Sequence, residues 1–369
     1  MVSHSYLDAD HGHRSDQHAH TKILESVGGD APLISQPLVV VTHRVHEEVK
    51  ALLSPTCRVI ANDSADSWPR EKLTELAREA DALMVFMPDS MDDGFLAQCP
   101  SLKIIAAALK GYDNFDVSSC TRRGIWFTIV PDLLSVPTAE LALGLMLGIT
   151  RNIAAGNDLV RSGNFRGWRP ALYGSGLHGR TIGIAGMGKL GRALARLLAG
   201  FNVSLIYADT VALAPQEEAL LRVRRLGFKE MLEQSDIVVA LLPLNGSTLH
   251  TVNAAAIAQM KPGSYLVNVG RGSVIDEHAV AHALDSGHLA GYAADVFEME
   301  DWARVDRPRA ISPRLLRHTD RTLFTPHLGS AVDSVRLQIE MAAAGNIISA
   351  LAGERPADAV NDPVSGRII

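Results

Sequence analysis

Three polar residues in the second half of the sequence each follow a short apolar run. An arginine, a glutamate and a histidine that lie close together could bind an anion and transfer a proton beside it. Arg271 lies in Asn-Val-Gly-Arg-Gly, Glu300 ends Asp-Val-Phe-Glu-Met-Glu, and His327 lies in Thr-Pro-His-Leu-Gly. A histidine can act as a general base, a nearby carboxylate favours its protonated form, and an arginine can hold an anion. Each residue alone is ambiguous, because a lone Arg or Glu is usually solvated and a lone His usually packs in a core.

A glycine-rich motif precedes these residues and is typical of a dinucleotide site. Gly186, Gly188 and Gly191 form the pattern G-x-G-x-x-G directly after the apolar run 181–185. The first glycine permits a tight turn, the second lets the backbone approach a pyrophosphate, and the third lets a helix pack closely on a strand. We therefore predict that the cofactor phosphates bind along the whole loop and the helix it opens: Gly186, Met187, Gly188, Lys189, Leu190 and Gly191.

An acidic residue follows this motif at the spacing expected for a ribose ligand. Asp209 ends the next apolar run and lies 23 residues after Gly186, close to the ~20 residues typical of the acid that binds the adenosine ribose. A carboxylate there repels a 2′-phosphate, and no Lys or Arg follows before Arg222. We therefore expect NAD as the cofactor in preference to NADP. Comparable catalytic efficiency with NADP would refute the assignment of Asp209.

Short β-branched or apolar runs alternate with helix-like stretches from Leu38 onward, which predicts parallel sheets built from βαβ units. The expected fold class is α/β with two Rossmann-like domains. The strands are expected in two series, at 38–42, 58–61, 82–86, 103–107 and 126–129, then at 181–185, 203–207, 237–241, 264–267, 291–294 and 322–325. Helical patterns are expected at 46–53, 70–80, 138–164 and 334–351.

The last helical pattern is followed by no further sheet signal, so it most simply packs onto the first unit. The substrate domain is then discontinuous, formed by 37–136 and 328–369, with the dinucleotide domain, 137–327, inserted in its middle. The active site is expected where these two domains meet. Residues 1–36, rich in His, Asp, Ser and Gly, do not read as a signal peptide and are expected to form a flexible tail.

Bulk properties exclude several classes of function. The 369 residues are 47% hydrophobic and carry a net charge of -6, so no basic field gathers nucleic acid. The longest apolar run, 141–149, is far shorter than the ~20 residues of a membrane-spanning helix. Three scattered cysteines fit neither a disulfide framework nor a zinc site, so we expect a reduced, cytoplasmic protein without a metal. Small and apolar residues on much of 138–164 call for burial at a domain hinge or in a second subunit.

The order Arg-Gly, then Asp-Val-Phe-Glu-x-Glu, then Thr-Pro-His-x-Gly is similar to the catalytic signature of the D-2-hydroxyacid dehydrogenase superfamily. The resemblance implies that His327 is the general base, that Glu300 orients it, and that Arg271 holds the substrate anion near the nicotinamide. Glu298 competes for the glutamate role, but the superfamily's catalytic Glu lies two positions beyond the first. The resemblance also implies a homodimer through 138–164 and further cofactor contacts from Thr138, Pro243, Thr248, Asp295 and Gly329.

Within the superfamily, the chain resembles the phosphite (phosphonate) dehydrogenases from about Leu38 to Leu351. Lys110 stands in the substrate loop where uncharged residues are commoner, and 301–304 read Asp-Trp-Ala-Arg where Pro is usual. Other similar segments are 86–89, 130–134, 167–170, 173–176 and 335–337. The resemblance implies oxidation of phosphite to phosphate with hydride transfer to NAD. Lys110 would be catalytic, and the residues lining the substrate would be Lys110, Gly111, Arg271, Arg336, Met87, Trp168 and Tyr173.

Two other functions stay open on the sequence. An ordinary D-2-hydroxyacid dehydrogenase acting on a small 2-hydroxy acid would carry the same Arg271, Glu300 and His327 and differ only in its pocket. An NAD-sensing, non-catalytic binding protein could share the fold. The intact set of these three residues with Lys110 argues against that sensor, and turnover would separate the possibilities.

Overall fold

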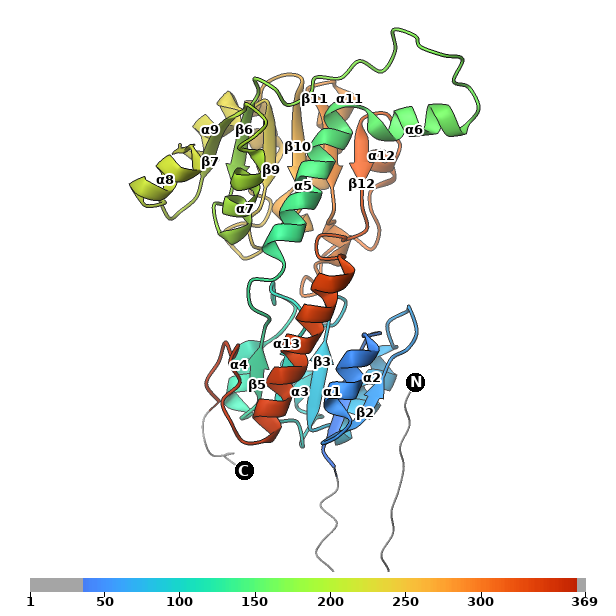
Figure 1. The fold of residues 1–369 in the computed structure, drawn as a ribbon, viewed down its shortest axis with the longest axis vertical. Helices are drawn as coiled ribbons and strands as arrows, with labels where there is room; N and C mark the ends of the chain where they lie inside the picture. The colour runs from blue at the N-terminus through green and yellow to red at the C-terminus, as the bar shows by residue number, and fades with distance from the viewer. Residues whose placement is uncertain (1–35, 364–369) are drawn as a thin grey trace, which may run out of the picture. The chain divides into compact units, whose positions relative to one another are not determined.

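The computed structural model describes residues 36–363, so the expected tail at 1–36 lies outside the described residues except for Gln36. Two parallel sheets organise the described chain (Figure 1). The first has the order β2-β1-β3-β4-β5, with β1 (Leu38–Val41), β2 (Arg58–Ala61), β3 (Ala82–Val85), β4 (Ile104–Ala107) and β5 (Trp126–Thr128).

The second sheet has seven strands in the order β12-β11-β10-β9-β6-β7-β8. Its strands are β6 (Thr181–Ala185), β7 (Ser204–Ala208), β8 (Val223–Arg225), β9 (Ile237–Ala240), β10 (Ser264–Asn268), β11 (Leu289–Ala294) and β12 (Thr322–Phe324). Every pairing within the two sheets is parallel. The α/β prediction with two Rossmann-like units is therefore confirmed.

Helices cover both faces of each sheet, which explains why several strands are apolar along their whole length. The four residues of β1, Leu-Val-Val-Val, are all buried, as are those of β3 and β9, because a parallel sheet has no solvated face. The helices around the first sheet are α1 (Glu47–Leu53), α2 (Arg70–Glu79), α3 (Asp93–Leu96), α4 (Val117–Arg122) and α13 (Asp333–Leu351). Those of the second half are α5 (Ser135–Thr150), α6 (Ile153–Arg161), α7 (Lys189–Leu198), α8 (Pro215–Leu221), α9 (Phe228–Gln234), α10 (Ala254–Gln259), α11 (Glu277–Asp285) and α12 (Pro313–Leu316).

The last helix, α13, belongs to the first sheet, although the whole second sheet separates them in sequence. It packs on β3, β4 and α1, and Figure 1 shows it, in red, beside β3 and the blue helix α1. Ile339, Ala343 and Ile347 of α13 are buried in the same core as β1 and β3. The dinucleotide unit is thus inserted into a unit built from both ends of the described chain. The boundaries at 136/137 and 327/328 stay a prediction.

All eleven predicted strands are present, with ends displaced by at most two residues, but two features differ from expectation. The single helix expected at 138–164 is two helices, α5 and α6, because Asn152 adopts the left-handed conformation with φ 54°. A left-handed residue interrupts a right-handed helix. The strand β8 was not expected, because it is short and two of its three residues are exposed arginines. No helix among residues 36–363 is both long and apolar enough to cross a bilayer.

Candidate active site

His327 and Glu300 form a hydrogen-bonded pair at the carboxyl ends of β12 and β11. Nδ1 of His327 lies 2.6 Å from Oε2 of Glu300, and their side chains are 28% and 27% exposed. The other carboxylate oxygen, Oε1, accepts the backbone N–H of Phe297 at 2.8 Å, which fixes the orientation of Glu300. Nε2 of the imidazole makes no hydrogen bond within residues 36–363, so this nitrogen is free to receive a proton from a substrate.

A buried carboxylate holds the loop that carries His327. Oδ1 of Asp295 accepts the Thr325 hydroxyl and the Leu328 N–H, both at 2.6 Å, and Oδ2 accepts the Gly329 N–H at 2.9 Å. His327 itself has φ 56°, and such left-handed strain persists where the surroundings over-determine it. Burial raises the pKa of Asp295 despite these hydrogen bonds. Asp295 therefore holds the loop, and its expected contact with the cofactor stays a prediction.

Glu298, the alternative partner of the histidine, points elsewhere. Its Oε2 lies 2.9 Å from Nε2 of His250 and 3.3 Å from an Arg304 nitrogen, and its Oε1 accepts the N–H of Glu277 at 3.1 Å. The geometry therefore pairs His327 with Glu300. Glu298 instead bonds to residues that do not include His327.

Arg271 follows β10, the strand next to β11, and meets the loop of the first sheet that carries Lys110. Its Nε donates to Oδ1 of Asp113 at 3.1 Å and a terminal nitrogen donates to the carbonyl oxygen of Gly270 at 3.0 Å. A Cβ placed on Gly111 would lie 1.5 Å from the Arg271 guanidinium. A side chain at position 111 would therefore displace the guanidinium, and glycine lets the backbone next to Lys110 lie against Arg271.

The Lys110 ammonium has a carboxylate partner in the free protein. Its Nζ lies 2.9 Å from Oδ1 of Asp132, and the Lys189 Nζ lies 3.8 Å from Oδ2 of the same carboxylate. Burial raises the pKa of Asp132, but hydrogen bonds from Ser135 and Lys110 outweigh that effect and leave it below its usual value. Asp132 thus links the substrate loop to the glycine-rich loop and partly neutralises both lysines.

Arg336 and Met87 lie at the carboxyl ends of the first sheet. The guanidinium of Arg336 stands 5.6 Å from the ring centroid of Phe86 and 3.5 Å from Oε1 of Glu340. Burial lowers the pKa of Arg336. Met87, next to Phe86, is partly buried, and its carbonyl oxygen accepts the Asn114 amide at 3.1 Å. None of the contacts within residues 36–363 joins Arg336 to Lys110 or Arg271, and the expected contact of Arg336 with the anion stays a prediction.

Trp168 and Tyr173 lie on an exposed segment at the far end of α5 from Gly329, and their expected contact with the substrate stays a prediction. They are 77% and 75% exposed, on the segment between α6 and the amino end of β6. The backbone next to Tyr173 is bonded to the end of α5, where Ser175 N–H donates to the Thr150 carbonyl at 3.0 Å. The Thr138 hydroxyl, near the start of α5, donates to the Gly329 carbonyl at 3.1 Å. Twelve residues of helix separate these two contacts, about 18 Å along the axis.

The glycine-rich loop has the shape that a dinucleotide requires. Gly186 has φ 101°, and a Cβ on Gly191 would lie 2.4 Å from the Gly186 carbonyl oxygen, so both positions need glycine. Gly188 has open space where a Cβ would stand, and no side chain caps the first turn of α7. Unpaired N–H groups at a helix start bind phosphate well. These residues therefore fit a pyrophosphate.

The remaining residues expected to bind the cofactor lie around this loop. Asp209, at the end of β7, accepts the Met187 N–H at 2.7 Å. The segment after β9 lies against Gly186 through Leu241, and within it the Thr248 hydroxyl donates to the Pro243 carbonyl at 2.6 Å. Thr138 and Gly329 meet beside Asp295. The structure thus groups these residues at the carboxyl ends of the strands, where ligands of parallel sheets bind, and their contacts with the cofactor stay a prediction.

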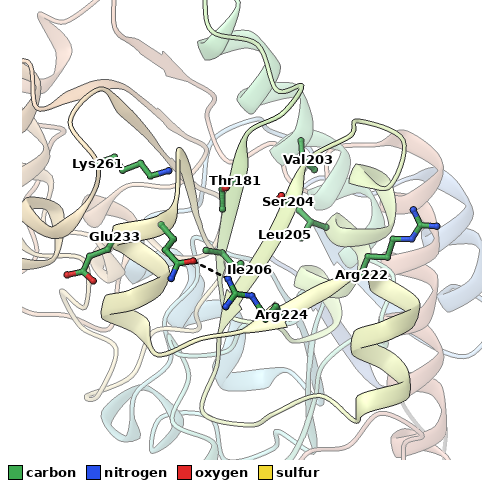
Figure 2. Close-up of a pocket in the computed structure, with 10 residues that line it drawn as sticks. Thr181, Val203, Ser204, Leu205, Ile206, Arg222, Arg224, Glu233 and Lys261 are labelled. Carbon is green, nitrogen blue, oxygen red and sulfur yellow. Dashed lines mark hydrogen bonds between the residues drawn. The ribbon is translucent and has the colours of Figure 1, made fainter.

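A hollow of about 600 Å³ at the opposite end of the second sheet is not this site (Figure 2). Its lining includes Thr181 and Ser204, the first residues of β6 and β7, with Arg224 and Lys261. Because ligands bind at the carboxyl ends of parallel strands, we assign no role in the chemistry to this hollow.

Two buried glutamates support the loops that carry Arg271 and Glu300. Glu298 N–H donates to Oε1 of Glu277 at 2.8 Å, and Glu277 N–H donates to Oε1 of Glu298 at 3.1 Å. Glu277 is 3% exposed, and burial raises its pKa to about 7. This exchange of hydrogen bonds ties the residues after β10 to those after β11.

Glu277→Gln should flatten the pH dependence of stability. A carboxyl whose pKa is about 7 when folded and ~4.3 when unfolded holds more protons in the folded state. The free energy of unfolding therefore falls as the pH rises between those two values. We expect the variant to lose less stability than the wild type between pH 5 and pH 8, by up to roughly 3 kcal/mol, in urea unfolding. The exposed Glu354→Gln control should keep the wild-type slope, and an unchanged slope in Glu277→Gln would contradict the prediction.

Comparison with known proteins agrees with this geometry. Residues 143–329 match the family described as D-isomer specific 2-hydroxyacid dehydrogenase, NAD binding domain. A glyoxylate reductase of Thermofilum pendens is 35% identical over 335 residues, which cover 90% of this chain and 96% of that relative. A glyoxylate reductase of Pyrococcus furiosus is 35% identical over 334 residues, covering 89% and 96% of the two chains.

Two solved structures extend the likeness to three dimensions. A glyoxylate reductase from Paecilomyes thermophila has a TM-score of 0.76 at 28% identity, covering 89% of this chain and 99% of its own. An NADPH-dependent glyoxylate/hydroxypyruvate reductase from Sinorhizobium meliloti, in complex with NADP and malonate, has a TM-score of 0.75 at 28% identity, covering 88% and 97%. Since the matched domain, the full-length relatives and the observed fold agree, this chain belongs to the D-isomer specific 2-hydroxyacid dehydrogenases and uses NAD as its cofactor.

Proposed function

We propose that the enzyme oxidises phosphite to phosphate with hydride transfer to NAD. The observation that supports this substrate is the approach of the Lys110 loop to Arg271 through Gly111. A compact dianion needs more positive charge than a monocarboxylate, and Lys110 adds a second cation to the loop whose Gly111 meets Arg271. The carboxyl ends of β10, β11 and β12 are neighbours in the sheet, so Arg271, Glu300 and His327 follow adjacent strands at one edge.

The side chains divide the reaction between them. Arg271 and Lys110 hold phosphite oxygens, and Nε2 of His327 removes a proton from an attacking water. A P–O bond forms as the P–H bond breaks. The hydrogen leaves phosphorus as hydride with the electron pair of the P–H bond, and NAD, when bound, would supply the acceptor. Glu300 stabilises the imidazolium through Nδ1, and that proton later passes to solvent. Phosphite, water and NAD thereby give phosphate, NADH and a proton.

The resident partner of Lys110 affects how such an anion binds. Asp132 lies 2.9 Å from the ammonium, so a bound dianion must share or displace this carboxylate. Lys189 offers Asp132 a second cation 3.8 Å away, which lowers the cost of the exchange. Binding of the anion and of the cofactor phosphates near Lys189 is therefore expected to be coupled.

A 2-hydroxy acid, whose oxidised partner is a 2-oxo acid such as glyoxylate, is the second candidate substrate. Its support is the comparison, since both curated relatives described above are named glyoxylate reductases. That support is more direct than the support for phosphite, but identity of 35% leaves the pocket free to differ. His327 and Glu300 would then move the proton of the hydroxyl group, and Arg271 would hold the carboxylate.

A substrate panel separates the two candidates. Purified protein is mixed with NAD and, in separate reactions, phosphite, glycerate, lactate or formate, and with NADH and glyoxylate, while NADH absorbance is followed. We expect phosphite to give the fastest reduction of NAD. NADH consumption with glyoxylate and no reaction with phosphite would assign the second candidate. Absence of turnover with every compound would favour the non-catalytic sensor.

Lys110→Ala should raise the KM for phosphite by about tenfold or more, because the loss of a charge-assisted hydrogen bond costs about 1.5 kcal/mol or more. Steady-state kinetics at saturating NAD measures this effect. The matched control is Lys103→Ala, which removes an exposed lysine paired with Asp81 at 3.1 Å. A Lys110→Ala enzyme that kept its phosphite affinity would count against the anion role.

Glu300→Gln should lower kcat by about a hundredfold or more, because the carboxylate that orients and stabilises a catalytic imidazole is worth this much in comparable sites. Glu298→Gln, the other glutamate of the motif, should lower the melting temperature, and it should lower kcat much less than Glu300→Gln does. Rate measurements with whichever substrate turns over test both variants. Equal losses of kcat in the two would remove the distinction drawn from the geometry.

We also propose that the protein is a homodimer in the cytosol. The exposed apolar side chains of α6 and the segment after it make a surface that a second copy would cover: Ile153, Val160, Phe165, Trp168 and Tyr173. In a dimer, Trp168 and Tyr173 could contact the substrate that is bound by the other subunit. We infer a reducing compartment because Cys57, Cys99 and Cys120 are buried and form no disulfide.

Light scattering at micromolar concentration should report twice the 39.7 kDa of one chain. Val160→Glu should shift the mass toward the monomer, because a buried unpaired charge opposes association. Leu220→Glu, an exposed change on α8, serves as the control. A monomeric wild-type mass would contradict the dimer.

A further inference from the structure

A smaller cavity adjoins the hollow of Figure 2, at the amino ends of β10, β9 and β6, which are neighbours in the sheet. Its volume is about 110 Å³, well above the ~10–15 Å³ that a single water molecule needs. Lys261, labelled in Figure 2, lines both spaces. We call the smaller one the amino-end cavity, and its polar lining residues are Ser175, Arg180, Asp236, Lys261, Ser264 and Tyr265.

The amino-end cavity contains a buried hydroxyl without a partner. Ser264, the first residue of β10, is 2% exposed, and its hydroxyl makes no hydrogen bond within residues 36–363. Buried polar groups nearly always have a partner, because an unpaired one costs free energy. The backbone of Ser264 is held in place, since its N–H donates to the Lys261 carbonyl oxygen at 3.0 Å. The hydroxyl therefore indicates a partner that these residues do not themselves supply.

The cavity also carries an uncompensated positive charge. Nζ of Lys261 lies 2.9 Å from Oδ1 of Asp236, whose Oδ2 accepts the Thr181 N–H at 2.8 Å, so this ion pair is neutral as a whole. Arg180 is partly buried, and in the described part of the chain its guanidinium makes neither a hydrogen bond nor an ion pair. A partly buried charge without a partner is unfavourable, so the guanidinium favours a negatively charged ligand.

The free polar groups of the cavity can all act as donors. Besides Arg180 and Ser264, the hydroxyls of Ser175 and Tyr265 make no hydrogen bond among residues 36–363. The carboxylate of Asp236 already has a donor at each oxygen. The oxygens of an inorganic oxyanion are strong acceptors and carry the opposite charge, so they suit such a set of donors. A metal cation would instead be repelled by the guanidinium.

We propose that the amino-end cavity binds a small inorganic oxyanion such as phosphate, held by the Arg180 guanidinium, the Lys261 ammonium and the Ser264 hydroxyl. The guanidinium offers several N–H donors in one plane, and the buried hydroxyl gains its missing partner. The cavity lies at the amino ends of the strands, whereas His327 follows the carboxyl end of β12. The bound anion is therefore not the substrate, and the site stands whether phosphite or a 2-hydroxy acid is oxidised.

Crystals of the full-length protein grown with selenate would locate the anion directly. Selenate is a tetrahedral oxyanion whose selenium can be found by anomalous scattering. We expect a selenium peak in the amino-end cavity of the wild type, with a selenate oxygen within hydrogen-bond distance of the Ser264 hydroxyl, and no peak there in Arg180→Gln. A wild-type cavity that holds only water, with selenate bound solely near Lys110 or at the glycine-rich loop, would overturn the proposal.

Calorimetric titration with phosphate at constant ionic strength tests the site in solution, with the protein saturated with NADH so that the cofactor phosphates occupy their own site. Arg180→Gln should weaken phosphate binding by about tenfold, because a charge-assisted hydrogen bond is lost. The matched control is Arg224→Gln, which removes a cation of the larger hollow that bonds to Gln234 at 3.1 Å and should leave the affinity unchanged. Equal weakening in both variants would mean that phosphate responds only to surface charge, and the proposal would fail.

Ser264→Ala separates anion binding from folding. Without phosphate, this variant should keep or raise the melting temperature, because it removes a buried hydroxyl that has no partner. Phosphate should raise the melting temperature of the wild type, since a ligand of the folded state stabilises it, and should raise that of Ser264→Ala and Arg180→Gln less. An equal rise in all three proteins would place the anion elsewhere and contradict the proposal. None of these results bears on phosphite oxidation, which the substrate panel tests separately.

Discussion

The buried carboxylate of Asp295 is the interaction on which the catalytic geometry depends. Its two oxygens hold three donors of the segment 325–329, and this clamp keeps His327 in a left-handed conformation at φ 56°. With the backbone so held, the imidazole meets Glu300 through Nδ1 at 2.6 Å and leaves Nε2 free. The imidazole that we propose as the general base is thus positioned by Asp295, which does so through the backbone of residues 325–329.

The cations around the candidate site each have a carboxylate partner before any substrate arrives. Arg271 pairs with Asp113 at 3.1 Å, Lys110 with Asp132 at 2.9 Å and Arg336 with Glu340 at 3.5 Å. Such pairing keeps partly buried positive charges from destabilising the fold. A bound anion therefore competes with these carboxylates for the cations. The specificity of the pocket depends on which of the three ion pairs breaks with the smallest loss of free energy.

Contacts between the two units link substrate binding to the cofactor half. The Arg271 guanidinium packs on Gly111, and the Ala303 N–H donates to the Asn114 side chain at 3.2 Å. Ala303 lies within the 301–304 segment that departs from the usual Pro of the superfamily. Loops from both units thus form one polar region. A change in the charge of the substrate should therefore affect the residues of both units.

The sequence by itself predicted eleven of the twelve strands and the glycine-rich loop, because each depends on residues near one another in the chain. It also suggested Asp209 as the ribose acid by spacing, and the roles of Arg271, Glu300 and His327 by resemblance to a family signature. Only the tertiary structure decided which glutamate meets His327, since the side chains of Glu298 and Glu300 leave one short turn in different directions. It also placed Trp168 and Tyr173 on an exposed segment after α6 and paired the unexpected strand β8 with β7. Those outcomes depend on the order of strands in a sheet and on where a helix ends, which are settled by packing between segments distant in sequence.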